Sequence, residues 1–231
     1  MKFLKAQEQH AASMESNSNL NITIEMRNLT LQGFGYLEDT GGGAVYVSGV
    51  KQVLFDHVHF TANTGRTGGA VFLRDTAAVV FRACSFSGWF RVILAVNGYL
   101  TTYWLVASTC LSCRVLSADN AAFEGGAVYL EENAHNVVIV DGEVSRCLAY
   151  SNGGFLHAGV TNNHITVNSS HFFMNEASNQ GGAFYLHDLN NDFAVTSSQF
   201  IENRAYHGAG IHLNTNNADL VVSDCDFIEN R

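Results

Sequence analysis

The stretch Gly68-Gly69-Ala70-Val71-Phe72-Leu73 decides the fold, because the chain repeats its pattern along most of its length. The other copies begin at Gly42, Gly125, Gly153, Gly181 and Gly208. Recurrence at a near-constant period is the signature of a repeat architecture. The paired glycines suit corners where the backbone adopts positive φ or passes close to a neighbour.

The spacing of the copies predicts the type of repeat. From Gly42 to Gly68 is 26 residues, and the intervals from Gly125 onward are 28, 28 and 27. Each unit joins a Gly-Gly corner, an apolar strand, a polar loop, a second strand and a Phe-x-x-Asn turn, without helical periodicity. We therefore predict an all-β fold, a right-handed parallel β-helix with coils of 26–28 residues.

The ends of the chain differ from its middle. Residues 1–19 are polar, contain no apolar signal-peptide core and are predicted to be disordered, whereas residues 20–231 are predicted to form the solenoid. The chain stops at Asn230-Arg231, where the next Gly pair is due. Because an uncapped solenoid exposes a bare strand edge, we expect further sequence beyond this point and an incomplete N-terminus.

A hydrophobic block, residues 89–119, interrupts the repeat. Gly68 and Gly125 are 57 residues apart, and removing these 31 residues restores both the 26-residue spacing and the motif Phe86-Ser87-Gly88-Asn120. The block is thus predicted to be an insertion into a finished coil. Two interpretations stay open, a packed flap or untranslated sequence retained by a gene model. A membrane span is excluded within the solenoid, because both flanks must rejoin in one coil.

Asparagine recurs at the end of the closing turn, where it is predicted to form a ladder of amides along the stack. The residues of this predicted ladder are Asn63, Asn120, Asn175, Asn203 and Asn230, and Cys147 takes the equivalent place in one coil.

The paired Gly-Gly-Ala-Val and Phe-x-x-Asn motifs resemble the repeats of chlamydial polymorphic outer membrane proteins and of similar right-handed β-helix proteins of the pectin-lyase-like type. The resemblance covers residues 41–231. It implies the β-helix fold and, because the polymorphic proteins are similar to autotransporters, a surface-exposed adhesive passenger. Function does not follow from such repeats alone, since one fold carries many functions.

A column of rings is the candidate binding site. Counted from the first glycine of each motif, the fourth and sixth positions are mostly aliphatic and are expected to face the core, so the fifth is expected to face outward. The fifth positions, called the ring column below, are Tyr46, Phe72, Tyr129, His157, Tyr185 and His212. Such a column suits stacking against a glycan or a partner protein. The alternative is that the rings stack on one another and only stabilise the coil.

No metal site or cofactor is predicted. Carboxylates follow the first strand of several coils, but their spacing matches no defined calcium loop, so Ca²⁺ binding is unsupported and solvated turns are expected. Cys110 and Cys113 have the spacing of a metal or redox pair but lack neighbouring ligands. The chain carries 21 acidic and 12 basic residues without a basic cluster, which argues against nucleic acid as a partner.

Taken together, these patterns predict a non-catalytic β-helix region of a surface or extracellular protein. Its role is predicted to be structural or adhesive, with a polysaccharide or a cell-surface protein as the partner. The alternatives are a polysaccharide lyase, epimerase or hydrolase, and an intracellular scaffold. Lyases need a base beside carboxylate-bound Ca²⁺ and hydrolases need facing carboxylic acids, and neither arrangement is evident in the repeat. No catalytic residue is therefore assigned.

Overall fold

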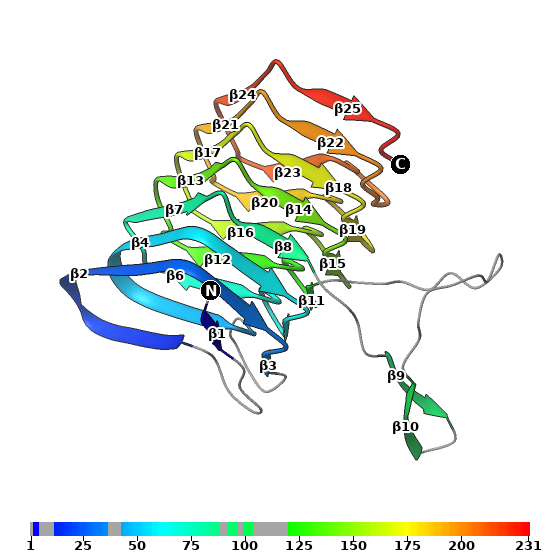
Figure 1. Ribbon diagram of the computed structural model, residues 1–231. Helices are drawn as coiled ribbons and strands as arrows, with labels where there is room; N and C mark the ends of the chain where they lie inside the picture. The colour runs from blue at the N-terminus through cyan, green and yellow to red at the C-terminus, as the bar shows by residue number, and fades with distance from the viewer. Residues whose placement is uncertain (1, 5–11, 37–42, 88–91, 97–98, 104–119) are drawn as a thin grey trace.

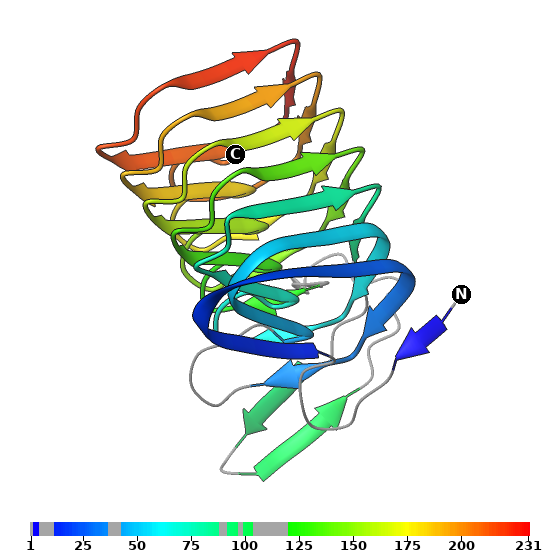
Figure 2. The ribbon, with the colours of Figure 1, turned by 90° about the vertical axis from the view of Figure 1, so that its left-hand side faces the viewer.

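A computed structural model describes residues 2–4, 12–36, 43–87, 92–96, 99–103 and 120–231. In these residues the chain consists of strands and turns without a helix, and it winds into a parallel solenoid of about six turns (Figure 1). The predicted all-β parallel solenoid is thereby confirmed. Seen from the side, equivalent strands of successive turns lie one above the other (Figure 2).

From β6 onward, each turn contributes one strand to each of three parallel series, and the long strand β4 (Val45–Thr61) pairs with the first strand of all three. The first series, which follows the Gly pairs, comprises β6 (Val71–Arg74), β12 (Val128–Glu132), β16 (Leu156–Val160), β20 (Phe184–Asp188) and β23 (Ile211–Thr215). The second comprises β7 (Ala78–Arg82), β13 (Val137–Val140), β17 (Ile165–Asn168), β21 (Phe193–Thr196) and β24 (Leu220–Ser223). The third comprises β8 (Ser85–Ser87), β14 (Glu143–Ser145), β18 (His171–Phe173), β22 (Gln199–Ile201) and β25 (Asp226–Ile228).

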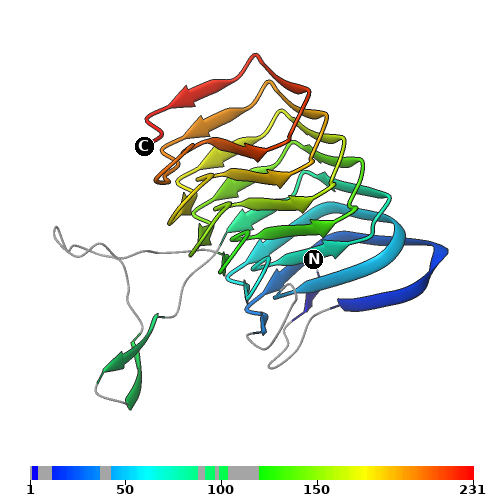
Figure 3. The same cartoon turned by 180° about the vertical axis from the view of Figure 1, so that it is seen from behind.

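A short sheet closes the corner between the third series and the first. Its strands are β3 (Gly35–Tyr36), β5 (Thr64–Gly65), β11 (Ala121–Ala122), β15 (Leu148–Ala149) and β19 (Glu176–Ala177). They are parallel and pair in the order of the turns, with Ala122 opposite Ala149 and Ala149 opposite Ala177. The view from behind shows these strands along one edge of the stack (Figure 3).

The N-terminal part differs from the predicted boundary at Leu20. Strand β1 (Lys2–Leu4) pairs with β2, and β2 (Ala12–Gln32) begins within the segment that was predicted to be disordered. The physical reason is that β2 lies parallel to β4 (Val45–Thr61), with Ala12 opposite Val45, so its backbone gains the hydrogen bonds of a neighbouring strand. The remaining residues of the segment lie outside the described part of the chain.

The core lies inside the stack and is filled by alternate residues of the strands. In the second series, for example, Val79 and Phe81 are 0% and 1% exposed, and Phe81 stacks on Phe55 at 4.8 Å between ring centroids. The fourth and sixth positions of the motif, counted from its first glycine, belong to the same core cluster, as Val71 and Leu73 do. Alternation with period 2 thus places one side of every strand inward, as the sequence predicts.

Glycine is required at the corner for two reasons. Gly68 has φ of +61°, a conformation that other residues rarely adopt. A Cβ on Gly69 would overlap the carbonyl oxygen of Gly126 in the next turn. The first glycine of the pair therefore sets the angle of the corner, and the second allows adjacent turns to approach.

The solenoid continues in register across the hydrophobic block. Thr64 lies opposite Ala121 and Val71 opposite Val128, although residues 88–120 separate β8 from β11 in the sequence. Within the block, β9 (Val92–Val96) and β10 (Tyr99–Tyr103) pair antiparallel with each other. The other residues of 89–119, with Cys110 and Cys113, lie outside the described residues. The register agrees with an insertion between two halves of one turn.

Among the residues that the structure describes, no helix has the length and hydropathy to cross a membrane.

Candidate functional site

The ring column lies on β4 and on the first strand series, one ring in each turn from β4 to β23. Its residues are direct Cα partners, since Tyr46 lies opposite Phe72, Phe72 opposite Tyr129, Tyr129 opposite His157, and so on to His212. The rings are also in contact, with successive centroid distances of 5.0, 5.6, 4.9, 4.8 and 5.6 Å. The structure therefore brings all six predicted residues together in one continuous stack.

The rings of this column are covered to a large extent. Phe72 is 1% exposed, Tyr185 3% and His157 4%, whereas Tyr46, Tyr129 and His212 are half-buried. None of the six belongs to the core cluster, so the column packs on the outer side of the strands. Tyr46, Phe72 and Tyr129 stack face to face, as do Tyr185 and His212, whereas His157 is tilted against both of its neighbours. A binding role of the column stays a prediction.

His157 occupies the most enclosed position in the column. It lies between the rings of Tyr129 and Tyr185, and its Nδ1 has no hydrogen-bond partner. The pKa of His157 is lowered to about 3, chiefly by burial and also by the nearby His187, while a hydrogen bond with the backbone of Asn152 opposes the shift. The imidazole is consequently neutral at pH 7 and packs as a ring.

Glu124 belongs to the turn that precedes the first strand series and is half-buried. Burial raises the pKa of Glu124, and His187 opposes that shift. Burial also raises the pKa of Tyr129 and Tyr185, and the charge of Glu124 adds to both shifts. The turn thus places a carboxyl group close to rings of the column, and burial stabilises the uncharged forms of all three groups.

At the C-terminal ends of the first strands, carboxylates surround Arg74. Its guanidinium lies 3.4 Å from Glu131, 3.1 Å from Glu132 and 3.5 Å from Asp75. Glu131 is the main cause of the raised pKa of Arg74. Further along, Asp188 accepts hydrogen bonds from Thr215 and Asn216. In the described part of the chain, no group of three or more His, Cys, Asp or Glu has an arrangement that could hold a metal ion.

The predicted Asn ladder residues are hydrogen-bonded between turns. Asn63 Nδ2 donates to Asn120 Oδ1 at 3.2 Å. In the later turns, Asn175 donates to Asn203 at 2.9 Å and Asn203 to Asn230 at 3.0 Å. Between the two runs, the backbone N–H of Cys147 donates to Asn175 Oδ1 at 3.1 Å. Asn63, Asn120, Asn175 and Asn203 are fully buried, so these bonds satisfy polar groups that water cannot reach.

A second series of buried amides was not foreseen from the sequence. It follows the first strand series, where the N–H of Asn162 donates to Asn190 Oδ1 and that of Asn190 to Asn217 Oδ1. Asn162 and Asn190 are 0% and 1% exposed. The available signal was an Asn after the first strand of three successive coils, but the loops around these residues carry no motif as regular as Phe-x-x-Asn.

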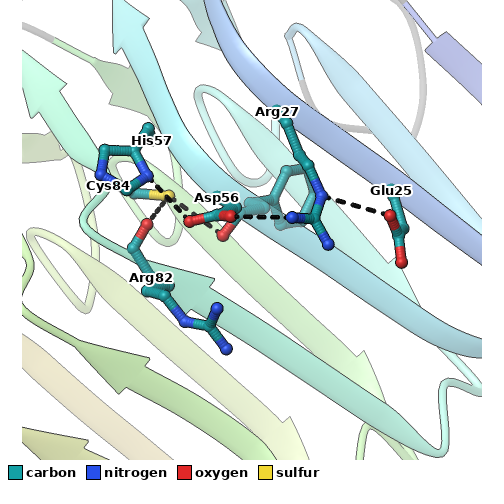
Figure 4. Close-up of polar contacts among 7 residues, drawn as sticks. Glu25, Arg27, Asp56, His57, Arg82 and Cys84 are labelled. Carbon is teal, nitrogen blue, oxygen red and sulfur yellow. Dashed lines mark hydrogen bonds and ion pairs between the residues drawn. The ribbon is translucent and has the colours of Figure 1, made fainter.

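An acid–histidine pair lies near a thiol on the side of β4 (Figure 4). His57 Nδ1 is 2.8 Å from Asp56 Oδ1, and Arg27 is 3.3 Å from the other carboxylate oxygen. The thiol of Cys84, however, donates to the carbonyl oxygens of Phe55 and Arg82, and burial raises its pKa to about 11. A nucleophilic cysteine reacts as the thiolate, whereas the raised pKa keeps the Cys84 thiol protonated. Cys84 therefore has a structural role.

A row of exposed side chains, called the corner strip below, was also missed. It occupies the position three residues after the ladder residue of each turn and consists of Arg66, Phe123, Tyr150, Ser178 and Tyr206. The rings of Phe123, Tyr150 and Tyr206 are 57%, 52% and 79% exposed. The sequence does contain an aromatic residue after Asn-Ala-Ala, after Leu-Ala and after Arg-Ala. That these three residues are aligned follows only from the register of the corner sheet.

No family model matches this chain, and neither a curated protein nor a solved structure matches it.

Proposed function

We propose that the chain is a non-catalytic β-helix region of a surface or extracellular protein, with a structural or adhesive role. The proposal includes right-handed winding, which parallel crossovers favour, and coils of 26–28 residues. Partners such as Val45 and Val71, or Leu156 and Phe184, support that coil length. The Gly-Gly-Ala-Val and Phe-x-x-Asn motifs and their resemblance to the polymorphic outer membrane proteins support the adhesive role.

The observation that carries this proposal is how the polar side chains are used. The buried side-chain amides of both Asn series bond from one turn to another rather than converging on a common point: Asn203 Nδ2 donates to Asn230, and Asn190 Oδ1 accepts from the N–H of Asn162. The guanidinium of Arg74 is held by carboxylates, and the Cys84 thiol by carbonyl groups. Side chains with catalytic potential are thus engaged in holding turns together, which suits a stiff rod.

The proposal is tested by an assay for polysaccharide cleavage. The purified chain is incubated with acidic and neutral polysaccharides, with and without Ca²⁺, and new reducing ends and unsaturated uronates are measured. We expect no product above that of the heat-denatured chain. Product that depends on the folded chain would contradict the non-catalytic role, with unsaturated uronates favouring the lyase alternative and new reducing ends alone favouring the hydrolase alternative.

A further inference from the structure

The corner strip is the part of the described surface where aromatic side chains are most accessible. Phe123, Tyr150 and Tyr206 follow the corner sheet in three of four successive turns, and Ser178 takes the same position in the turn between Tyr150 and Tyr206. Large exposed rings in one line are uncommon on a surface without a partner. Neither packing in the core nor hydrogen bonding in the Asn ladders accounts for these exposed rings.

Backbone hydrogen bonds fix the strip as a straight row. The N–H of Tyr150 donates to the carbonyl of Ala122 at 3.0 Å, and that of Ser178 to the carbonyl of Ala149 at 3.0 Å. In the opposite direction along the stack, the Ala177 N–H donates to the carbonyl of Arg204 in the following turn, two residues before Tyr206. Successive positions are consequently about 4.8 Å apart along the axis, the usual distance between paired strands.

The side chains that flank the row are polar and partly preordered. Asn179 donates to Asn152 Oδ1 at 3.1 Å, which places two amides beside the strip. The ring of Tyr206 contacts that of His207 edge-on, with centroids 4.6 Å apart. A rigid aromatic side chain loses little entropy when it binds, and amides add hydrogen bonds at low cost.

The shape and charge of the strip limit what it can bind. The row is one residue wide, so its apolar area is far below the roughly 800 Å² per partner of a stable protein interface. Its five positions hold an arginine, three rings and a serine, without a carboxylate, in a chain with nine more acidic than basic residues. An extended polymer with apolar faces and polar edges, neutral or negatively charged, meets these conditions.

We propose that the corner strip binds an extended polysaccharide strand, which runs along the solenoid axis with sugar rings stacked on Phe123, Tyr150 and Tyr206. A pyranose ring suits this surface because its C–H groups form an apolar face and its hydroxyls lie at the edge. Ser178 provides no ring for stacking, so one sugar unit spans the distance between Tyr150 and Tyr206. The flanking amides of Asn152 and Asn179 form hydrogen bonds with sugar hydroxyl groups. This inference rests on the adhesive part of the proposed function.

The test measures binding of the whole chain to soluble polysaccharides by affinity electrophoresis and calorimetry. The probes are hydroxyethyl cellulose, a neutral extended chain, polygalacturonate, an acidic one, and dextran as a flexible control. We expect binding to one extended polymer and at least a tenfold loss for Tyr150→Ala. The matched control is Phe173→Ala, which removes a ring that is 37% exposed away from the strip and is expected to bind as the unchanged chain does.

Arg66→Ala distinguishes the two extended polymers, because it is expected to weaken binding to polygalacturonate and to leave binding to hydroxyethyl cellulose unchanged. The inference is overturned if the chain binds neither extended polymer, or if Tyr150→Ala binds as tightly as Phe173→Ala. It is also overturned if sedimentation shows that the strip joins two copies of the chain and that Tyr150→Ala separates them. None of these results involves cleavage, so failure of the inference is distinct from failure of the non-catalytic role.

Discussion

The ring column and the corner strip both carry one side chain per turn, yet only one of them is open to solvent. Phe72 in the ring column is 1% exposed, whereas Phe123 in the corner strip is 57% exposed. The ring column stands on a strand and is packed between adjacent rings, while the strip stands on a turn that points away from the stack. A periodic aromatic position in a solenoid can therefore be structural or exposed, and burial distinguishes the two.

The largest effect is expected when a covered ring is removed. Phe72→Ala deletes a ring packed between Tyr46 and Tyr129 and should lower the free energy of unfolding by about 4 kcal/mol, the usual cost of a buried Phe→Ala change. Urea denaturation followed by circular dichroism measures this change. Phe72→Leu, which keeps most of the apolar volume, should lose clearly less. A loss for Phe72→Ala below about 1 kcal/mol would place this ring outside the packed structure.

A smaller effect is expected from the ladder that leads into the corner strip. Asn203→Ala leaves the buried amide and backbone N–H of Asn175 without their acceptor, and each such group costs about 1–3 kcal/mol. We expect a total loss on the order of 3 kcal/mol, because two donors are affected. Asn179→Ala removes an exposed amide and should stay within about 0.5 kcal/mol of the unchanged chain. Equal losses for the two variants would show that the ladder bonds do not stabilise the stack.

The third effect depends on pH and concerns His157. Its folded pKa of about 3 lies below the usual 6.5, so unfolding takes up a proton at acidic pH. Above pH 6.5, protonation of His157 does not lower the free energy of unfolding. As the pH falls from 6.5 toward 3 this free energy decreases, by about 2 kcal/mol at pH 5. His157→Phe keeps a ring in the stack and removes this proton uptake.

The measurement for His157 is the free energy of unfolding of both chains at pH 7 and pH 5. The variant should gain stability relative to the unchanged chain by about 2 kcal/mol on going to pH 5. Parallel stability curves for the two chains would mean that His157 is not enclosed.

Much of the fold was predictable from local pattern. The Gly pairs mark where the first strands begin, and their spacing predicts the register in which Tyr46, Phe72 and Tyr129 become partners. The same spacing predicts that Thr64 meets Ala121 across residues 89–119. These features depend only on the repeat, so the sequence carries them directly. The start of β2 at Ala12 was missed, because pairing with β4 compensates for a weak local pattern.

The candidate sites were less predictable, because burial of an outward residue depends on groups from other turns. His157 is enclosed by the rings of Tyr129 and Tyr185, which belong to neighbouring turns, and no local pattern reveals such cover. The opposite error concerns Phe123 and Tyr150. They stand in turns whose sequences vary, so their alignment emerges only when the pairs of the corner sheet are known.

The central claim is that the ring column stabilises the solenoid and the corner strip does not. The most direct test compares Phe72→Ala with Phe123→Ala by urea unfolding under the same conditions, since both remove the same side chain from positions that differ in burial. We expect a loss of about 4 kcal/mol for Phe72→Ala and a change within about 0.5 kcal/mol for Phe123→Ala. Equal losses, or a larger loss for Phe123→Ala, would contradict it.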